Sequence, residues 1–354
     1  MFLYILLFVI LAGLSFIDLT NLSPQKKQFL LFLIGTGTIL FFGGRFECDN
    51  DYANYIFFYD QTPPLYEITW DDFIRLYLGF QVEPLFFFFS SIFQTFGLGG
   101  QAIILFYSFC TFGIIINIIR KTTQYPLIAF FLYTTCYFSL PFMQMRFGLS
   151  AACCLYAVLN AENRLKYWKW QIIAILFHMT SIIGICFYIF QRFNLSLKKS
   201  VFLLISSFLL VFLPIRTLFT LIVNSIGMSR YLNYLNEDSV SLSSCIMHMV
   251  LFSPLIIFQN SLKEHIYKFN LFLKMAVFAI ILMAVTTQLP ILNRFSILFA
   301  TSSCVSITFY LFLLKENKSN FVIAWILFVA YAFLKFYPSL NHINPYQFYF
   351  LANE

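Results

Sequence analysis

Residues 43–55 bring charged and aromatic side chains together at the end of an apolar segment, in a chain that carries few charges elsewhere. The members of this stretch that could do chemistry are Arg45, Glu47, Asp49, Asp51, Tyr52 and Tyr55. Arginine can hold phosphate oxygens through its planar guanidinium, and a carboxylate can bind hydroxyl groups or accept a proton. Tyrosine rings can stack on sugars, although aromatic belts at membrane interfaces also explain tyrosines. The stretch therefore predicts a site for a polar ligand, in which Asp51 is the carboxylate to test while Glu47 and Asp49 solvate the loop.

Other arginines lie at the ends of apolar segments. The distribution of basic loops predicts that these ends are on the same, external side of the membrane as residues 43–55. The arginines are Arg146, Arg230 (followed by Tyr231) and Arg294. Their position runs against the usual excess of Lys and Arg on the cytoplasmic side, and a diphosphate with a lipid tail would need cations at this depth. The simpler explanation is that each arginine extends to the interface or pairs with a loop carboxylate. Together with the acidic loop, the arginines favour a site for a lipid-linked sugar.

Two further residues are candidates for acid–base chemistry. Glu83 immediately precedes Pro84 at the start of an apolar segment, and His178 lies in the middle of another apolar run. Ionisable residues inside a membrane segment are costly and often functional, although a neutral histidine bonded to Thr180 or Ser181 is an alternative explanation. We expect a general base among Glu83, His178 and Asp51.

The composition excludes an ordinary soluble protein. Of 354 residues, 60% are hydrophobic and only 10% are charged, against about 25% charged in soluble domains, and the mean hydropathy is +0.82. The net charge of +7 is spread over short loops, which is typical of positive-inside bias and does not suggest nucleic-acid binding. Seven of the eight cysteines are expected to pack in apolar runs, whereas Cys48 lies in the polar loop, and we expect no metal and no cofactor.

The elements that must position these residues are membrane helices, since the bilayer requires every backbone group to be paired within the protein. We predict an all-α polytopic integral membrane protein of about 10–12 transmembrane helices, as a single multispan domain over residues 1–354. The expected apolar segments are 2–18, 28–44, 101–119, 125–142, 147–161, 171–190, 200–227, 242–258, 269–289, 295–314 and 321–337.

The distribution of basic residues predicts the topology. Loops such as those holding Lys26-Lys27 and Arg120-Lys121 are expected to be cytoplasmic, whereas the acidic loop at about 45–83 and a second loop at about 228–241 are expected to be external. To keep this order, 84–97 must be a re-entrant or interfacial helix that begins at Pro84. A short surface helix is predicted over Tyr66 to Phe80. One conflict stays open: either 171–190 dips in and returns, or 200–227 is broken at Pro214-Ile215-Arg216.

The order of these motifs resembles the EpsG-type oligosaccharide polymerases, which are close in role to the Wzy O-antigen and capsule polymerases. The resemblance runs from about residue 28 to 314 and rests on Arg45…Asp51-Tyr52…Tyr55, Glu83-Pro84, Met145-Arg146, Leu176-Phe177-His178, Arg230-Tyr231 and Arg294. Cys48-Asp49-Asn50 stands where the family often has Gly and Thr before the aspartate, and Arg146-Phe147 stands where it often has Arg-Gln. The arginine and the aspartate are kept in both places.

The resemblance implies a metal-independent membrane glycosyltransferase with a polyprenyl-diphosphate sugar donor, in the bacterial inner (cytoplasmic) membrane with its active site facing the periplasm or exterior. It would transfer the growing glycan to a second lipid-linked repeat unit and release undecaprenyl diphosphate, in the company of a flippase and a chain-length regulator. We assign Arg146, Arg230 and Arg294 to the diphosphates, Arg45 with Asp51 to shaping the site, and Glu83 or His178 to the base. Sugar contacts are assigned to Tyr52, Tyr55 and Tyr231.

Two alternatives remain at the level of the sequence. A flippase or transporter of lipid-linked oligosaccharide would be expected to show internal repeats and a cationic cavity through the bilayer centre, and no repeat stands out here. A membrane O-acyltransferase acting on polysaccharide is supported by His178 alone and leaves the arginines unexplained.

Overall fold

The computed structural model describes residues 1–80, 82–225, 241–314 and 318–352. These residues form helices, and no β-strand occurs among them apart from isolated bridges between residues 45 and 348 and between residues 49 and 343. They divide into two compact units, each of which is described by itself: unit 1, Met1–Met179 with Leu314–Glu354, and unit 2, Thr180–Leu313.

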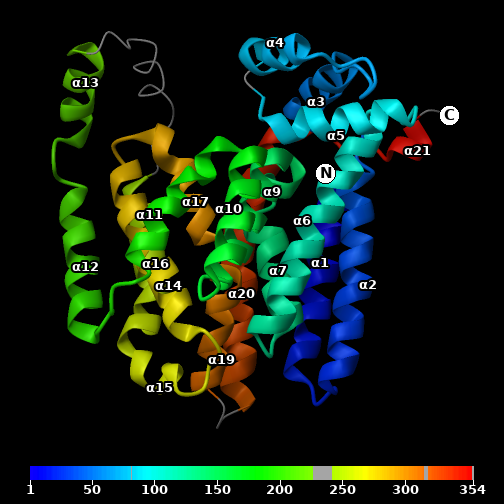
Figure 1. The fold of residues 1–354 in the computed structure, drawn as a ribbon. Coiled ribbons are helices and arrows are strands. Elements are labelled where there is room, and N and C mark those ends of the chain that lie inside the picture. Colours follow the sequence, from blue (N-terminus) through cyan, green and yellow to red (C-terminus); the bar gives the residue numbers. More distant parts are fainter. Residues whose placement is uncertain (81, 226–240, 315–317, 353–354) are drawn as a thin grey trace. The chain divides into compact units, whose positions relative to one another are not determined.

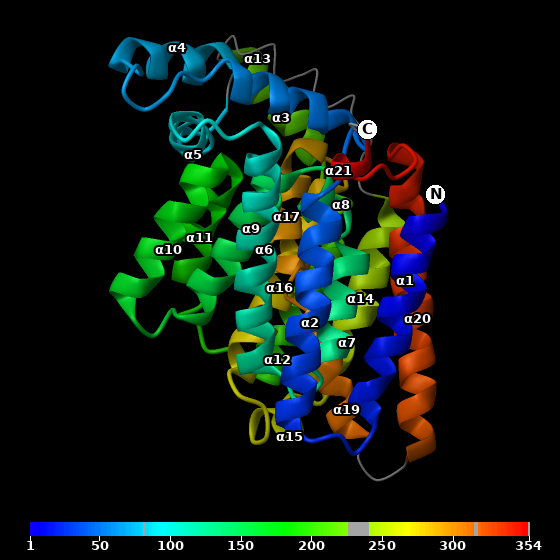
Figure 2. The ribbon, with the colours of Figure 1, turned by 90° about the vertical axis from the view of Figure 1, so that its right-hand side faces the viewer.

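Unit 1 is built on long helices that pack side by side (Figure 1, Figure 2). They are α1 (Phe2–Ser15), α2 (Pro24–Gly43), α6 (Gln101–Thr122), α7 (Pro126–Cys136), α9 (Met145–Leu159), α10 (Arg164–Phe177) and α20 (Lys318–Ser339). Helix α6 packs against α2 and α9, α9 packs against α10, and α7 packs against α1 and α20. Proline opens both α2 and α7, where its missing N–H has no intrahelical partner to lose and its fixed φ suits the helix.

Short helices gather at the end of unit 1 where α2 ends and α6 begins (Figure 1, Figure 2). They are α3 (Asn50–Asp60), α4 (Trp70–Phe80), α5 (Pro84–Thr95), α8 (Ser139–Phe142) and α21 (Tyr349–Ala352). The predicted surface helix is therefore present as α4, but it begins at Trp70. It starts there because Thr69 and Asp72 bond to each other's backbone N–H at 3.1 Å, which is a capping arrangement. The predicted helix from Pro84 is present as α5.

The chain after α20 returns to the loop that follows α2. Asn344 N–H donates to Cys48 O at 2.8 Å, Phe46 N–H donates to Gln347 O at 3.0 Å, and the Tyr346 ring stacks on Phe41 with centroids 4.2 Å apart. These bonds satisfy backbone groups that a short loop cannot pair within itself. The C-terminal segment thereby fixes the loop that carries Arg45.

Unit 2 contains shorter and more broken helices. They are α11 (Ile183–Phe190), α12 (Leu197–Leu210), α13 (Ile215–Ser225), α14 (Leu242–Ile257), α15 (Gln259–Lys263), α16 (Phe269–Thr286), α17 (Asn293–Ala300), α18 (Ser303–Ser306) and α19 (Tyr310–Leu313). Helices α12 and α13 meet at 63°, across a break that ends at Pro214, because proline cannot donate to the preceding turn. The break considered for 200–227 is thus present, and the 171–190 run is interrupted as well, after α10 ends at Phe177.

Among the described residues, five helical segments are long and apolar enough to cross a membrane: Phe2–Leu19, Gln101–Thr122, Phe269–Thr286, Asn293–Leu313 and Ser319–His342. The bent pair α12 and α13 would make six. Shorter apolar helices add to these, including α5, α7, α9 and α14. The prediction of an all-α, polytopic membrane protein is confirmed. The number of 10–12 spans, the single multispan domain and the sides assigned to the loops stay predictions.

Candidate functional site

Glu83 and Arg146 meet inside unit 1 although they are 63 residues apart in the chain. Arg146 Nη1 donates a hydrogen bond to Glu83 Oε2 at 2.5 Å. The two side chains are only 9% (Glu83) and 19% (Arg146) exposed. Within the described residues, the buried Nε of Arg146 has no hydrogen-bond partner. A guanidinium carries five N–H donors, so this arginine has donors left for a further anion.

Local sequence signals place both members of the pair. Glu83 is the extended residue before Pro84 at the start of α5, as expected because a proline disfavours helical backbone at the residue before it. Arg146 is the second residue of α9. The first turn of α9 lies close to α8 at Gly148, where an added Cβ would lie 2.6 Å from the carbonyl oxygen of Leu140. A glycine therefore allows the close backbone approach that aims Arg146 at Glu83.

His178 lies beside the carboxylate of Glu83. Its backbone is extended at the end of α10, which places it at a helix break and not in the middle of a continuous apolar helix. Its Nδ1 is 3.8 Å from Glu83 Oε1, and the next residue, Met179, donates its N–H to the same oxygen at 3.3 Å. The Ser150 hydroxyl donates to Ala174 O at 2.6 Å, so α9 supplies a donor for a carbonyl in the last turn of α10.

Two tyrosines cover this cluster. The Arg146 guanidinium carbon lies 5.8 Å from the centre of the Tyr55 ring, a cation–π distance, and burial raises the pKa of the Tyr55 hydroxyl to about 12. Tyr107 of α6 is fully buried beside Phe86, and its hydroxyl has no hydrogen-bond partner in the described part of the chain. Sequence reasoning missed Tyr107, because a tyrosine in an apolar helix does not differ from a lipid-facing one in the sequence.

Arg45 forms a separate, fully buried cluster. Its Nε lies 2.8 Å from Asp49 Oδ2, its Nη1 donates to Phe42 O at 2.7 Å, and it lies over the Phe142 ring. Asp49 caps α3 by accepting from the backbone N–H of Asp51 at 3.0 Å. Asp49 is thus a buried partner of Arg45, unlike the solvated loop residue that the sequence suggested, because the turn into α3 brings the two side chains together.

Gln101 was also missed by sequence reasoning, and it ties this loop to α6. Its amide donates to Gly43 O at 2.5 Å and to Arg45 O at 3.1 Å, and its carbonyl oxygen accepts from the Tyr52 hydroxyl at 2.8 Å. Burial raises the pKa of Tyr52 as well. Arg45 and Tyr52 are therefore held by other residues of the protein.

The remaining predicted residues are Asp51, Arg230, Tyr231 and Arg294. Asp51 is half-buried in the first turn of α3, Arg294 is exposed on α17 of unit 2, and Arg230 and Tyr231 lie outside the described residues. The structure thus brings Glu83, Arg146, His178 and Tyr55 together, while their chemical roles stay predictions. Within the described ranges, no group of three or more His, Cys, Asp or Glu side chains is arranged to hold a metal ion.

Comparison with known proteins gives one positive result. Neither the curated proteins nor the solved structures contained a match to this chain. The model of the EpsG family, by contrast, matches residues 28–348, which span nearly the whole chain and include the cluster around Glu83. This family is associated with glycosyl transfer in polysaccharide biosynthesis. The chain, a multi-pass membrane protein, therefore belongs to the EpsG family.

Proposed function

We propose that this protein polymerises polyprenyl-diphosphate-linked oligosaccharide repeat units of an O-antigen, capsule or exopolysaccharide. The reaction takes place at the external face of the cytoplasmic membrane and releases undecaprenyl diphosphate. The single observation that carries the proposal is the cluster of Glu83, Arg146 and His178 in unit 1. It combines a cation for phosphate with two proton acceptors, which are the groups that this reaction needs.

The reaction requires a base for the hydroxyl proton and a cation for the departing diphosphate. A hydroxyl oxygen of the acceptor sugar attacks the anomeric carbon of the donor, the bond from that carbon to the diphosphate oxygen breaks, and the hydroxyl proton passes to a base. Negative charge grows on the departing diphosphate, so a fixed cation there stabilises the transition state more than the bound substrate. Arg146 is suited to this role because it is held rigidly and is largely shielded from water.

We assign the proton to His178 and a positioning role to Glu83. Both oxygens of Glu83 have donors nearby, Arg146 on one side and the Met179 N–H on the other, so this carboxylate is suited to orienting its neighbours. A carboxylate beside one nitrogen of a histidine orients the ring and stabilises the imidazolium that forms during catalysis. His178 Nδ1 lies 3.8 Å from Glu83 Oε1. We expect this distance to shorten when substrate binds, as catalytic hydrogen bonds often do.

The assignments of Arg45 and Tyr55 follow from their burial. Arg45 is fully buried and paired with Asp49, so we propose that it supports the loop while Tyr55 forms the wall beside Arg146. The assignment of Arg230 and Arg294 to the second diphosphate is kept as a proposal, as is that of Tyr231 to the sugar. Flippase and chain-length regulator are the proposed functional partners, in the bacterial cytoplasmic membrane.

The test is complementation of a polymerase-deficient strain, with chain length read from gels of the polysaccharide. Arg146→Ala is expected to abolish long chains at normal protein level. Arg75→Ala is the matched control, since Arg75 is an arginine of α4 whose side chain is 72% exposed. Full-length polymer from Arg146→Ala would refute the proposal.

Two readouts separate the alternatives. Loss of a polymerase leaves single lipid-linked repeats on the external leaflet, whereas loss of a flippase traps them on the cytoplasmic side. Loss of an O-acyltransferase leaves chain length intact, and mass spectrometry of the product would show missing acyl groups.

A further inference from the structure

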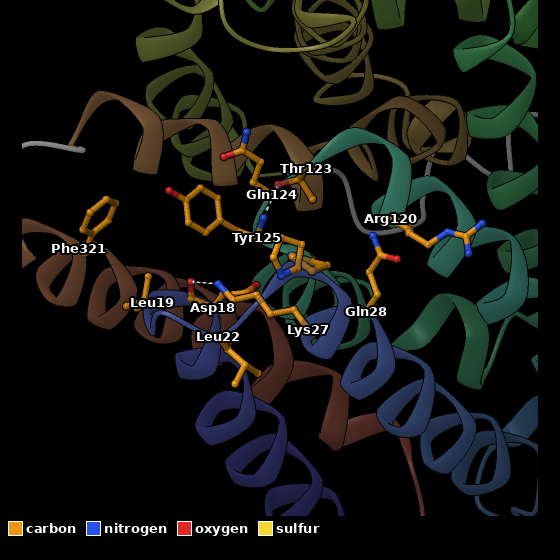
Figure 3. Close-up of a pocket in the computed structure, with 12 residues that line it drawn as sticks. Asp18, Leu19, Leu22, Lys27, Gln28, Arg120, Thr123, Gln124, Tyr125 and Phe321 are labelled. Atoms are coloured by element: carbon orange, nitrogen blue, oxygen red, sulfur yellow. Dashed lines mark hydrogen bonds between the residues drawn. The ribbon is translucent and has the colours of Figure 1, made fainter.

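A second candidate site lies at the end of unit 1 opposite to α3, α4 and α5. It is a cavity of about 470 Å³ between the end of α1, the start of α2, the end of α6 and the start of α7 (Figure 3). Helix α2 alone has 20 residues, or about 30 Å of length, which separates this cavity from the loop at Arg45. The cavity is therefore independent of the cluster around Glu83.

The polar side of the cavity carries two cations. Lys27 and Arg120 line it together with the amide of Gln28, and Figure 3 shows Gln28 between the two basic side chains. Lys27 Nζ donates to the backbone oxygen of Asp18 at 2.7 Å, which uses one of its three donors. Neither cation forms an ion pair within 4.0 Å in the described part of the chain. Both therefore have donors to offer an anion.

The one carboxylate in the cavity wall is already engaged. Asp18 is 2% exposed, and its Oδ2 accepts from the backbone N–H groups of Leu127 and Ile128 at 2.7 and 2.9 Å. These donors belong to the first turn of α7, where N–H groups lack intrahelical partners and favour negative charge. Asp18 thus anchors α7 through Oδ2, while its buried Oδ1 has no hydrogen-bond partner among the described residues. With this carboxylate counted, the two cations Lys27 and Arg120 still leave the wall with an excess of positive charge.

The wall also has an apolar part, formed by Leu19, Leu22 and Phe321, beside polar residues such as Thr123 and Gln124. Leu19 ends one candidate membrane span and Arg120 lies in the last turn of another, so the cavity lies at the level where headgroups meet acyl chains. A basic, partly apolar pocket between membrane helices is the usual form of a lipid headgroup site. Its volume is in the range of small-molecule sites.

We propose that this cavity binds the headgroup of an anionic phospholipid, with the phosphate on Lys27 and Arg120 and the glycerol and first acyl carbons against Leu22 and Phe321. A soluble phosphate compound would use the same cations but would gain nothing from the apolar wall. The basic loops at this end are those that the sequence predicts to face the cytoplasm, where the leaflet is rich in anionic lipid. The proposal does not depend on the glycosyl transfer proposed above.

The test titrates the delipidated full-length protein in neutral detergent with phosphatidylglycerol or phosphatidylcholine and counts bound lipid by native mass spectrometry. The double variant Lys27→Gln/Arg120→Gln is compared with Lys26→Gln/Lys121→Gln, which removes two exposed cations outside the cavity wall. At about 1 kcal/mol for each basic residue, the cavity variant is expected to lose about thirtyfold in affinity for phosphatidylglycerol. The control pair is expected to change it much less.

Three results would overturn the proposal: equal losses in both double variants, no preference for phosphatidylglycerol, or displacement of the lipid by millimolar inorganic phosphate. The last result would identify a soluble anion site. Arg120→Gln alone keeps the test decisive if the double variant fails to fold, because Arg120 is exposed. It is expected to lose about fivefold by the same reasoning.

Discussion

The Glu83–Arg146 pair allows stability and catalysis to be separated by a double-mutant cycle. In Arg146→Met, the carboxylate of Glu83, only 9% exposed, loses its cation. An unpaired buried charge costs about 3–5 kcal/mol. We expect a loss of stability near 3 kcal/mol, because the Met179 N–H at 3.3 Å and His178 at 3.8 Å still face the carboxylate.

Turnover of Arg146→Met is expected to fall for a reason that is separate from the loss of stability. Removal of one preorganised donor to developing negative charge costs about 2.7–4 kcal/mol, or roughly 10²–10³ in turnover. Adding Glu83→Gln to Arg146→Met removes both charges, which is often nearly neutral for folding. The double variant should therefore regain most of the stability and none of the turnover.

The assay is polymerisation of a synthetic polyprenyl-diphosphate repeat unit by purified protein, with thermal unfolding measured on the same samples. The control cycle uses Arg75→Met and Asp72→Asn, a pair whose side chains are 72% and 27% exposed. This pair should contribute at most about 1 kcal/mol, and its loss should leave turnover near wild type. Turnover that recovers together with stability in the Glu83→Gln/Arg146→Met protein would show that the pair is only structural, and the reasoning would be refuted.

Three other predictions concern the surroundings of the site. Arg45→Met should destabilise the protein by about 3–5 kcal/mol, measured by thermal unfolding, because its pair with Asp49 is fully buried. Gly148→Ala should lower turnover, since an added Cβ would lie 2.6 Å from the Leu140 carbonyl oxygen, and Gly148→Val should lower it further because valine adds two methyl groups at the same place. Stability should fall from pH 10 to 12, by about 1.4 kcal/mol per pH unit, because Tyr55 stays protonated in the folded state up to a pKa of about 12 but loses its proton near 10 when unfolded.

Each of these predictions has a control. An Arg45→Met/Asp49→Asn double variant should be more stable than Arg45→Met, and equal stability would argue against the ion pair. Gly113→Ala on α6 is the control for Gly148, since nothing lies within 4 Å of a Cβ added there. Tyr55→Phe should remove the part of the stability loss between pH 10 and 12 that is due to Tyr55. An unchanged pH profile would exclude Tyr55 as the source of that loss.

The sequence by itself determined the class of the protein and the positions of its main helices. Apolar composition requires membrane helices whatever their packing, and local signals such as Pro84 at a first helical turn act within a few residues. Hence α5, α6 and the surface helix α4 could be predicted closely. The same holds for the residue types of the candidate site, since arginine and histidine side chains are conspicuous in an apolar chain.

Only the tertiary structure decided which of these residues act together. The sequence predicts that Arg45 acts with Asp51 and that Arg146 binds a diphosphate, whereas packing buries Arg45 against Asp49 and places Arg146 on Glu83. The bond between Met179 and Glu83 joins residues 96 positions apart, so no local pattern encodes it. The physical reason is that the helix break at His178 and the approach of α9, α10 and α5 are set by how side chains fill the space between helices, and this packing is a property of the folded chain as a whole.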